Sequence, residues 1–322
     1  MPVSIVSLDE LLNGSVRRYP CVAALGAFDG VHLGHQAILE SAREKAQALG
    51  GCSIALTFDR LPAEVLKPKQ APMLITLPEA RFSLLERMVD EVVVIPFDQQ
   101  LIHLEATDFI EQALIKGLGT VGVVVGFNYT FGKGAKGTAE LLQRCAAANL
   151  LNVTVVPPVE AVGGQVSSTR IRKHIDTGEI ALANALLGRP FRLTGQVIAG
   201  DARGRVLGYP TANVAVDSRL ILPHPGVYVT RFQSPIPNNP ALQETHTAVT
   251  AISNRPTFSG KDISVESFVL DYDRDLYGQV VYLDFLHRLR DIRRFNDAAE
   301  LSAQIARDVE AARAYVKQHR RC

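Results

Sequence analysis

Cysteine is scarce in this chain, and its distribution excludes several classes of protein. The 322 residues contain four cysteines, Cys21, Cys52, Cys145 and Cys322. No two of them form a C-x-x-C pair, and none joins a histidine in a cluster with zinc-ligand spacing. A small disulfide-braced domain and a structural zinc domain are therefore not expected. We expect reduced thiols in a cytoplasmic protein.

Long apolar runs and charge of one sign are also missing. The N-terminus lacks the basic segment and apolar run of a signal peptide, and no run approaches the ~20 residues of a spanning helix. The formal net charge is only +1, from 34 basic and 33 acidic residues, and no block of five or more like charges occurs. We expect a soluble protein that binds neither nucleic acid nor membranes.

The first half of the chain alternates short apolar runs with helical patterns. Continuous apolar strands separated by helices are typical of a parallel sheet that is covered on both faces. With right-handed crossovers, this pattern predicts a doubly wound α/β domain, whose ligands bind beyond the carboxyl ends of the strands. The expected strands are Val22–Leu25, Ser53–Phe58, Val92–Pro96, Val121–Val125 and Val153–Val156.

The second half has short runs rich in β-branched residues and punctuated by Gly, Pro and Asn. This pattern favours a small antiparallel β-barrel or sandwich, and we expect the barrel. A final helix is expected from about Asp297 to Gln318. A helix over Ile180–Leu187 followed by Gly-Arg-Pro marks the boundary. Since single cores stop growing near ~250–300 residues, we expect two domains, residues 1–186 and 187–322.

The most informative segment of the first half is Gly26–His35 (GAFDGVHLGH), which follows an apolar strand and opens a helix. Glycines there let backbone N–H groups approach a phosphate chain, and the helix N-terminus adds a positive dipole end. His32 and His35 share one face of the first turn. Two imidazoles there can stabilise charge that develops on an α-phosphate and on departing pyrophosphate.

This segment resembles the signature of adenylyltransferases related to class I tRNA synthetases. Its longer form, G-x-F-D-G-x-H-x-G-H, is similar to that of bacterial bifunctional riboflavin kinase/FAD synthetases. Two further segments resemble the same family: Ser167–Arg172 (SSTRIR), before a helix, and Gly126–Gly132 (GFNYTFG), after the strand VGVVV. Hydroxyls and backbone donors at a helix start suit phosphate. The resemblance implies that Asn128 contacts substrate or nucleotide, and that Ser168, Thr169 and Arg172 contact triphosphate.

The second half carries its own motif in Gly200–Asn213 (GDARGRVLGYPTAN). Its glycines and basic residues could cover phosphates. Thr211 and Asn213 are two residues apart, so on a strand they point to the same face. A hydroxyl and an amide oxygen on one face suit Mg²⁺, which prefers hard oxygen ligands and bridges ATP phosphates. The motif resembles the G-x-x-x-G-R-x-L-G-(F/Y)-P-T-A-N signature of riboflavin kinases.

Glu266 is a lone acidic residue on an expected strand, Ser264–Tyr272. Such a carboxylate is usually solvated, but the resemblance implies that it is the base for the riboflavin hydroxyl. The resemblance extends over roughly Val22 to Tyr315. It implies catalytic roles for Glu266, His32 and His35, metal binding by Thr211 and Asn213, and nucleotide or phosphate contacts by Gly26, Phe28, Asp29, Gly30, Asn128, Ser168, Thr169, Arg172, Gly200, Gly204, Arg205 and Gly208.

Two loops depart from the family pattern. Thr57–Pro62 (TFDRLP) stands where the family has T-F-x-P-H-P, so the loop's histidine is missing. Ala251–Pro256 (AISNRP) stands where the family has N-I-G-x-R-P, so a turn beside the flavin is expected to differ. Either change could weaken one activity.

The sequence therefore predicts an enzyme of FAD biosynthesis. Its C-terminal domain would phosphorylate riboflavin to FMN with ATP, and its N-terminal domain would adenylylate FMN to FAD with release of pyrophosphate. ATP, riboflavin, FMN and a divalent cation, Mg²⁺ or another, are the expected partners, and a monomer is the default state. Three alternatives remain: an adenylyltransferase for another phosphate such as phosphopantetheine or nicotinamide mononucleotide, an enzyme with one activity intact, and a flavin- or nucleotide-binding regulator.

Overall fold

The computed structural model describes residues 3–13, 20–148, 151–199, 208–236, 239–257 and 260–319. The backbone separates into two compact units, Met1–Ser168 and Thr169–Cys322. The helices that precede the barrel therefore group with the second unit from Thr169 onward. The domain boundary expected at residues 186 and 187 stays a prediction. Within the described ranges, no helix is long and apolar enough to cross a membrane.

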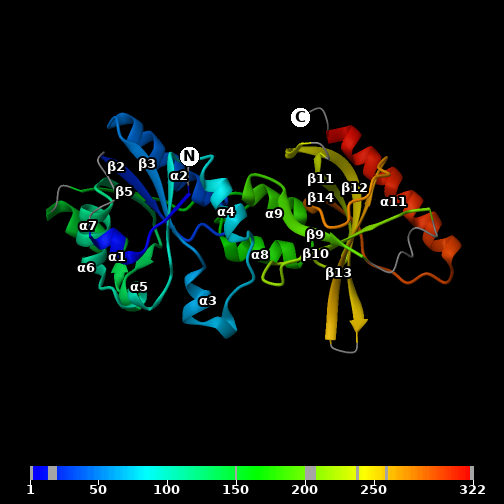
Figure 1. Cartoon of the computed structure of the whole chain (residues 1–322), viewed down its shortest axis with the longest axis horizontal. Coiled ribbons are helices and arrows are strands. Elements are labelled where there is room, and N and C mark those ends of the chain that lie inside the picture. Colours follow the sequence, from blue (N-terminus) through cyan, green and yellow to red (C-terminus); the bar gives the residue numbers. More distant parts are fainter. Residues whose placement is uncertain are drawn as a thin grey trace. The chain divides into compact units, whose positions relative to one another are not determined.

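The first unit is built on a parallel six-stranded sheet with the order β1-β4-β3-β2-β5-β8 (Figure 1). The chain first builds outward from β2 through β3 to β4, and then returns to the other side of β2 with β5 and β8. The carboxyl ends of β2 and β5 therefore flank the switch point, where open α/β sheets bind ligands. The strands are β1 (Val3–Ile5), β2 (Cys21–Leu25), β3 (Cys52–Phe58), β4 (Glu91–Ile95), β5 (Thr120–Gly126) and β8 (Asn152–Val156).

Helices and short turns join these strands, and β6 (Thr130–Phe131) pairs with β7 (Gly137–Thr138) in a separate ribbon. Residues 106–117 form two consecutive segments, the helix α6 and the π-helical segment η2. The elements are α1 (Leu8–Leu12), α2 (Leu33–Ala48), α3 (Pro62–Leu66), η1 (Pro68–Gln70), α4 (Pro78–Leu85), α5 (Gln99–His103), α6 (Ala106–Asp108), η2 (Phe109–Gly117), η3 (Lys133–Ala135) and α7 (Ala139–Ala148).

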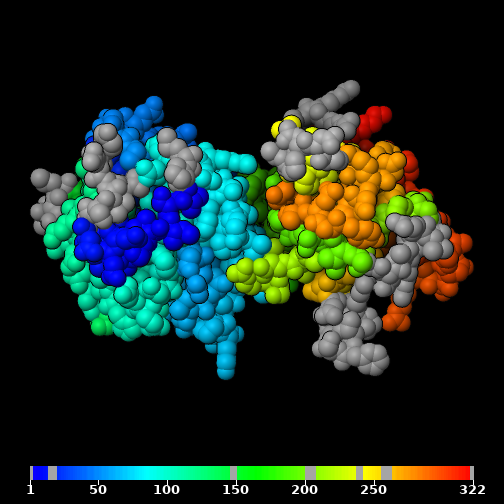
Figure 2. Space-filling view, in the orientation of Figure 1, coloured from blue at the N-terminus to red at the C-terminus, as the bar shows by residue number. Residues whose placement is uncertain are grey.

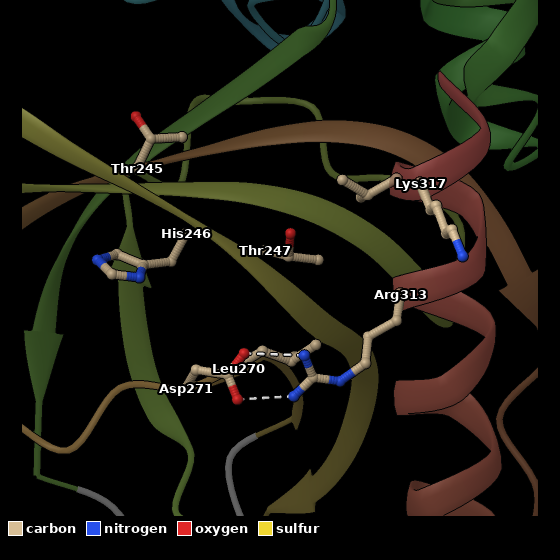
Figure 3. Close-up of a pocket in the computed structure, with 8 residues that line it drawn as sticks. Thr245, His246, Thr247, Leu270, Asp271, Arg313 and Lys317 are labelled. Atoms are coloured by element: carbon tan, nitrogen blue, oxygen red, sulfur yellow. Dashed lines mark hydrogen bonds and ion pairs between the residues drawn. The ribbon is translucent and has the colours of Figure 1, made fainter. Parts of the chain in front are cut away.

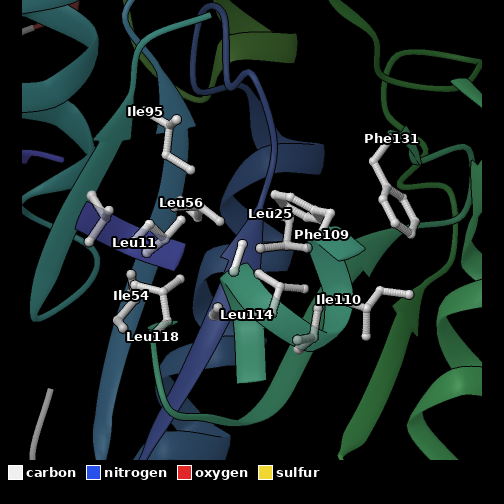
Figure 4. Close-up of a cluster of buried hydrophobic side chains, with 14 of the residues drawn as sticks. Leu11, Leu25, Ile54, Leu56, Ile95, Phe109, Ile110, Leu114, Leu118 and Phe131 are labelled. Atoms are coloured by element: carbon white, nitrogen blue, oxygen red, sulfur yellow. The ribbon is translucent and has the colours of Figure 1, made fainter. Parts of the chain in front are cut away.

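Alternate residues of each strand enter two different cores, which confirms that the sheet is covered on both faces. On one face, Leu25, Leu56 and Ile95 pack against α1, η2 and α7 (Figure 4). On the other, Ala24 and Val94 pack against α2 and α4. Because both faces are buried, the central strands are largely apolar, which is why continuous apolar runs predicted them.

The second unit is a closed antiparallel barrel with the strand order β10-β13-β12-β11-β14-β9, and β9 pairs with β10 to close it. The expected barrel is therefore confirmed. Its elements are α8 (Ser168–Asp176, assigned to this unit from Thr169), α9 (Ile180–Leu187), β9 (Phe191–Ile198), β10 (Ala212–Val216), β11 (Gly226–Ile236), β12 (Asn239–Thr257), β13 (Gly260–Val269), β14 (Val280–Arg290) and α11 (Ala298–His319).

The final helix, α11, is attached to the barrel by apolar and ionic contacts. Ala312 is fully buried among residues of β11 and β12. Arg290, at the end of β14, donates to both carboxylate oxygens of Asp308 at 2.7–3.1 Å, and Gln304 donates to the same carboxylate at 2.8 Å. Two polar residues of the helix, Gln304 and Asp308, are therefore buried on the barrel side together with Ala312.

Three hydroxyl groups form a ladder across three strands of the barrel. Thr250 of β12 lies 2.6 Å from the hydroxyl of Thr230 on β11 and 2.7 Å from that of Ser267 on β13. All three side chains are fully buried. Buried hydroxyls are costly unless they are hydrogen-bonded, so each depends on its neighbours.

We expect Thr250→Val to lower the free energy of unfolding by about 1–3 kcal/mol, because the isosteric change leaves two buried hydroxyls with one partner fewer each. Thr245→Val is the matched control, since Thr245 is exposed on the same strand and should change stability by less than ~0.5 kcal/mol. Urea denaturation of the full chain measures both values. Equal effects of the two variants would contradict a stabilising ladder.

Candidate active sites

The segment Gly26–His35 joins β2 to α2 and has an unusual backbone. Phe28, Gly30 and Val31 have positive φ angles of 52°, 82° and 39°. This region favours glycine and is costly for a β-branched residue such as Val31. Phe28 and Val31 are also buried in the core beneath α2. The loop therefore holds a conformation that its own sequence disfavours, and contacts from elsewhere must stabilise it.

Asp29 supplies those contacts. Its side chain is 4% exposed, and its carboxylate accepts hydrogen bonds from the backbone N–H groups of Ile75 and Thr76 at 3.1 Å and from the Thr76 hydroxyl at 3.3 Å. The Thr76 hydroxyl also accepts from the Gly30 amide at 3.1 Å. The Asp29 carboxylate thus joins the loop after β2 to the segment that precedes α4. A contact of Asp29 with nucleotide stays a prediction.

Two glycines of the loop are required by its geometry. A Cβ at Gly26 would lie 2.9 Å from the ring of Phe28, and a Cβ at Gly30 would lie 3.1 Å from the side chain of Ile75 at a positive φ. Both positions therefore need the smallest residue. The packing is accompanied by internal hydrogen bonds, since the Gly26 and Val31 amides donate to the carbonyls of Leu56 and Phe28 at 3.2 and 3.0 Å.

The two histidines form one unit at the start of α2. His32 caps the helix, and its Nδ1 accepts the backbone N–H of His35 at 3.3 Å. The imidazole rings are stacked, with centroids 3.6 Å apart and planes 14° from parallel, while the Phe28 ring meets His35 edge-on. Because Nδ1 of His32 accepts, its neutral ring carries the proton on Nε2. The structure brings the predicted pair together and gives it a donor nitrogen.

Ser168 joins the same loop. Its hydroxyl donates to the backbone carbonyl of Asp29 at 3.0 Å. Asn128 is exposed in the turn after β5, and β5 is the neighbour of β2 in the sheet, so the two loops leave adjacent strand ends. Thr169 is exposed and Arg172 is partly buried on α8, within the second unit. Their predicted contacts with triphosphate remain predictions.

The second candidate site is set by strand register in the barrel. Asn213 of β10 lies directly opposite Glu266 of β13, and Glu266 lies opposite Ala251 of β12. Directly opposed residues have Cβ atoms roughly 4.5–5.5 Å apart on the same face of a sheet. Glu266 lies between Val265 and Ser267, which are buried, and is itself partly exposed. Asn213 and Glu266 therefore project together from the outer face of the barrel.

The approach to this pair is only partly described. Thr211 immediately precedes β10 and is partly exposed, and Gly208 has a positive φ of 81°. Tyr209 packs edge-on against Phe268, two residues beyond Glu266, with ring centroids 5.3 Å apart. The predictions for Gly200, Gly204 and Arg205 lie outside the described residues. Within the described residues, no three His, Cys, Asp or Glu side chains converge as a metal site.

A pocket of about 490 Å³ lies elsewhere in the second unit, between β12 and α11 (Figure 3). Arg313 of α11 crosses it and pairs with both carboxylate oxygens of Asp271 at 2.7 and 2.8 Å. None of the predicted site residues that the structure describes lines it. The lining residues are Thr245, His246, Thr247, Leu270, Asp271, Arg313, Val316 and Lys317.

Comparisons with known proteins agree with the two modules. A family model described as FAD synthetase matches residues 15–170, and one described as riboflavin kinase matches residues 187–316. Curated proteins named bifunctional riboflavin kinase/FMN adenylyltransferase are similar along nearly the whole length. The chain is 36% identical to the protein of Listeria monocytogenes, over 91% of this chain and 92% of that one.

Other relatives give the same result. Those of Pseudomonas fluorescens and Escherichia coli, with the same name, are 37% and 34% identical over 91% and 92% of this chain and 92% of each relative. A crystal structure described as a macrolide-efflux protein from Streptococcus pneumoniae has a TM-score of 0.85 and 33% identity, covering 96% of this chain and 98% of that one. That description names a different function, whereas both family models agree with the names of the curated relatives.

We expect Asp29→Asn to destabilise the first unit by about 1–3 kcal/mol, because an amide has one acceptor oxygen and places its NH₂ group among backbone donors. Asp9→Asn, at an exposed position in α1, is the control and should have almost no effect. The midpoint of thermal unfolding of both variants checks this. An unchanged midpoint for Asp29→Asn would show that the loop holds its conformation without the carboxylate.

Proposed function

The chain belongs to the bifunctional riboflavin kinase/FMN adenylyltransferase family, and on that premise we propose that it converts riboflavin to FMN in the barrel unit and FMN to FAD in the α/β unit. The observation that carries this proposal is the presence of both sites in one chain. Stacked histidines cap the helix after β2, and Asn213 faces Glu266 across two barrel strands. Riboflavin, FMN and ATP are the proposed substrates of a cytoplasmic enzyme.

In the first reaction, Glu266 orients the 5′-hydroxyl of the ribityl chain and accepts its proton. The hydroxyl oxygen attacks the γ-phosphorus of ATP, the bond to the bridging β–γ oxygen breaks, and FMN and ADP form. Phosphoryl transfer depends on an oriented nucleophile more than on a strong base. Glu266 suits that requirement, because its strand neighbours on both sides are buried. It also lies opposite Asn213, the proposed ligand of the ATP–metal complex.

A divalent cation, Mg²⁺ or another, fits the residues beside Glu266. The Thr211 hydroxyl and the Asn213 amide oxygen would hold it, since Mg²⁺ prefers hard oxygen ligands. Two neutral protein ligands leave the other coordination positions for ATP phosphates and water. When bound, the ion neutralises phosphate charge. Thr211 and Asn213 therefore determine where the triphosphate lies relative to the nucleophile.

In the second reaction, a phosphate oxygen of FMN attacks the α-phosphorus of ATP, and pyrophosphate leaves. The nucleophile is already an anion, so the site has to bring two anions together and stabilise the charge on the leaving group. The Nε2–H of His32, the imidazole of His35 and the N–H groups at the start of α2 are the proposed donors. Asn128 and Ser168, with Thr169 and Arg172 of α8, are proposed to position the nucleotide.

The two steps can be separated by substitution in the full chain. We expect Glu266→Gln to lower the rate of FMN formation from riboflavin by about 10²–10⁴-fold, because the base is lost while the shape is kept. FMN supplied directly should still become FAD at the unmodified rate. We expect His32→Ala to have the reverse effect, lowering FAD formation by about 10²–10³-fold.

Chromatographic separation of flavins over time measures both rates, and each variant is the folding control for the other. Loss of both activities in either variant would contradict the assignment of one reaction to each unit.

The proposed cation site predicts a specific change in metal dependence. We expect Asn213→Ala to raise the Mg²⁺ concentration for half-maximal riboflavin phosphorylation by about 10-fold or more, because removing one ligand typically costs ~1.5 kcal/mol or more. Asn128→Ala should leave that concentration unchanged. Titration of kinase activity with Mg²⁺ tests this, and parallel curves for Asn213→Ala and the unmodified chain would reject the site.

A further inference from the structure

Arg60 stands out among the cations of the first unit because it is exposed yet held in one direction. It lies between β3 and α3, and its side chain is 57% exposed. Its Nε donates to Oδ2 of Asp59 at 2.9 Å, and its Nη2 lies 2.8 Å from the same oxygen. A guanidinium has five N–H donors. Asp59 engages Nε and Nη2, and for the remaining N–H groups the structure records no hydrogen bond within the described residues, although the charge of Glu64 lies nearby.

The backbone on both sides of Arg60 is fixed. The Asp59 amide donates to the carbonyl of Ile95 at 3.3 Å, and the Asp59 carboxylate accepts from the Phe97 amide at 2.8 Å. On the other side, the Leu61 amide donates to Glu64 at 2.6 Å. Burial alone would raise the pKa of Asp59, but the Phe97 amide and Arg60 outweigh it and lower the pKa below its usual range. The carboxylate that orients Arg60 thus stays ionised.

A second arginine supports this loop from beneath. Arg81 of α4 is 1% exposed, and its Nη2 donates to the carbonyl of Phe58 at 2.5 Å and to that of Asp59 at 3.5 Å. Burial lowers the pKa of Arg81, while the charge of Asp29 acts against that shift. Arg81 therefore lies within electrostatic range of Asp29 and in contact with the end of β3. It fixes the backbone that immediately precedes Arg60.

The position of Arg60 in the sheet places it at the ligand-binding edge. β3 is the direct neighbour of β2, and the Thr57 hydroxyl donates to the carbonyl of Ala27 at 3.4 Å, so the two strands end at the same level. Arg60 follows Thr57 by three residues. In Figures 1 and 2, α3, directly after this turn, stands out from the surface of the first unit.

We propose that Arg60 binds a phosphate group of FMN or of ATP during adenylyl transfer, as a cation oriented in advance by Asp59. The inference rests on the proposed function. Both substrates carry phosphate, and an arginine whose rotamer is already fixed loses less conformational entropy on binding an anion than a flexible one. The turn is also one of the two segments where this chain departs from its family's pattern, so the contact would be a property of this sequence.

The test compares Arg60→Ala with Arg43→Ala in the full chain. Arg43 is a matched control because its side chain is 53% exposed and paired with Glu40 at 2.6 Å, but it lies in the second half of α2, well away from the end of the sheet that binds ligand. Steady-state formation of FAD gives the KM for FMN and the KM for ATP separately. Formation of FMN from riboflavin in the same preparation reports the other unit.

We expect Arg60→Ala to raise one of the two KM values by about 10–100-fold, as loss of a charge-assisted hydrogen bond does. The substrate whose KM rises is the one that supplies the phosphate. Arg60→Lys should recover part of the effect, added salt should narrow the difference from the unmodified chain, and Arg43→Ala should match the unmodified chain. Riboflavin phosphorylation should not change in any variant.

Equal KM values for Arg60→Ala and Arg43→Ala would overturn the inference and leave the proposed function intact. A fall in kcat with both KM values unchanged and a lower unfolding midpoint would also overturn it, by assigning Arg60 a structural role. An unmodified chain that forms no FAD from FMN and ATP would overturn the proposed function and the inference together.

Discussion

The α/β unit depends on one buried carboxylate. Asp29 receives hydrogen bonds from the segment before α4 and holds the loop after β2 in a conformation with positive φ angles that its own residues disfavour. The histidine cap, the stacked rings and the contact from Ser168 all follow that loop. The backbone N–H groups of Ile75 and Thr76 stabilise this buried charge, as hydrogen bonds to a carboxylate do.

The barrel unit positions its candidate residues by a different physical means. Asn213 and Glu266 are brought together by antiparallel register, and a shift of one residue would turn Glu266 into the barrel interior. The hydroxyl ladder of Thr230, Thr250 and Ser267 lies on the opposite side of these strands and includes the residue next to Glu266. Closure of the barrel between β9 and β10 leaves no edge at which the register could slip.

Much of this could be predicted from the sequence because its signals are local. Continuous apolar runs gave the central strands, and the spacing of His32 and His35 gave the pair that the structure stacks. Other features depend on distant partners. The contact of Asp29 with Thr76 spans 47 positions and has no motif. Asp308 looks like a solvated residue of α11 until Arg290 of β14 is seen beside it.

The edge strand β1 and the helix α1 were also missed. β1 has three residues and lies at the edge of the sheet beside β4, so it is too short to produce a recognisable pattern. Arg81 shows most clearly what the sequence alone does not predict. Its place in a short helix is typical of a surface cation, yet it is among the largest fully buried side chains described. Its burial depends on carbonyl groups at the end of a strand more than twenty positions earlier.

Val31 has a consequence for how this sequence could change over evolutionary time. A β-branched residue at a φ of 39° is an expensive choice, and glycine at the same place would relieve that cost. The same replacement would widen the range of shapes open to the loop and remove a buried side chain from the core under α2. Relief of the backbone strain is thus one substitution away, but that substitution would also give up a buried apolar contact and the rigidity of the loop, so valine balances one cost against the other.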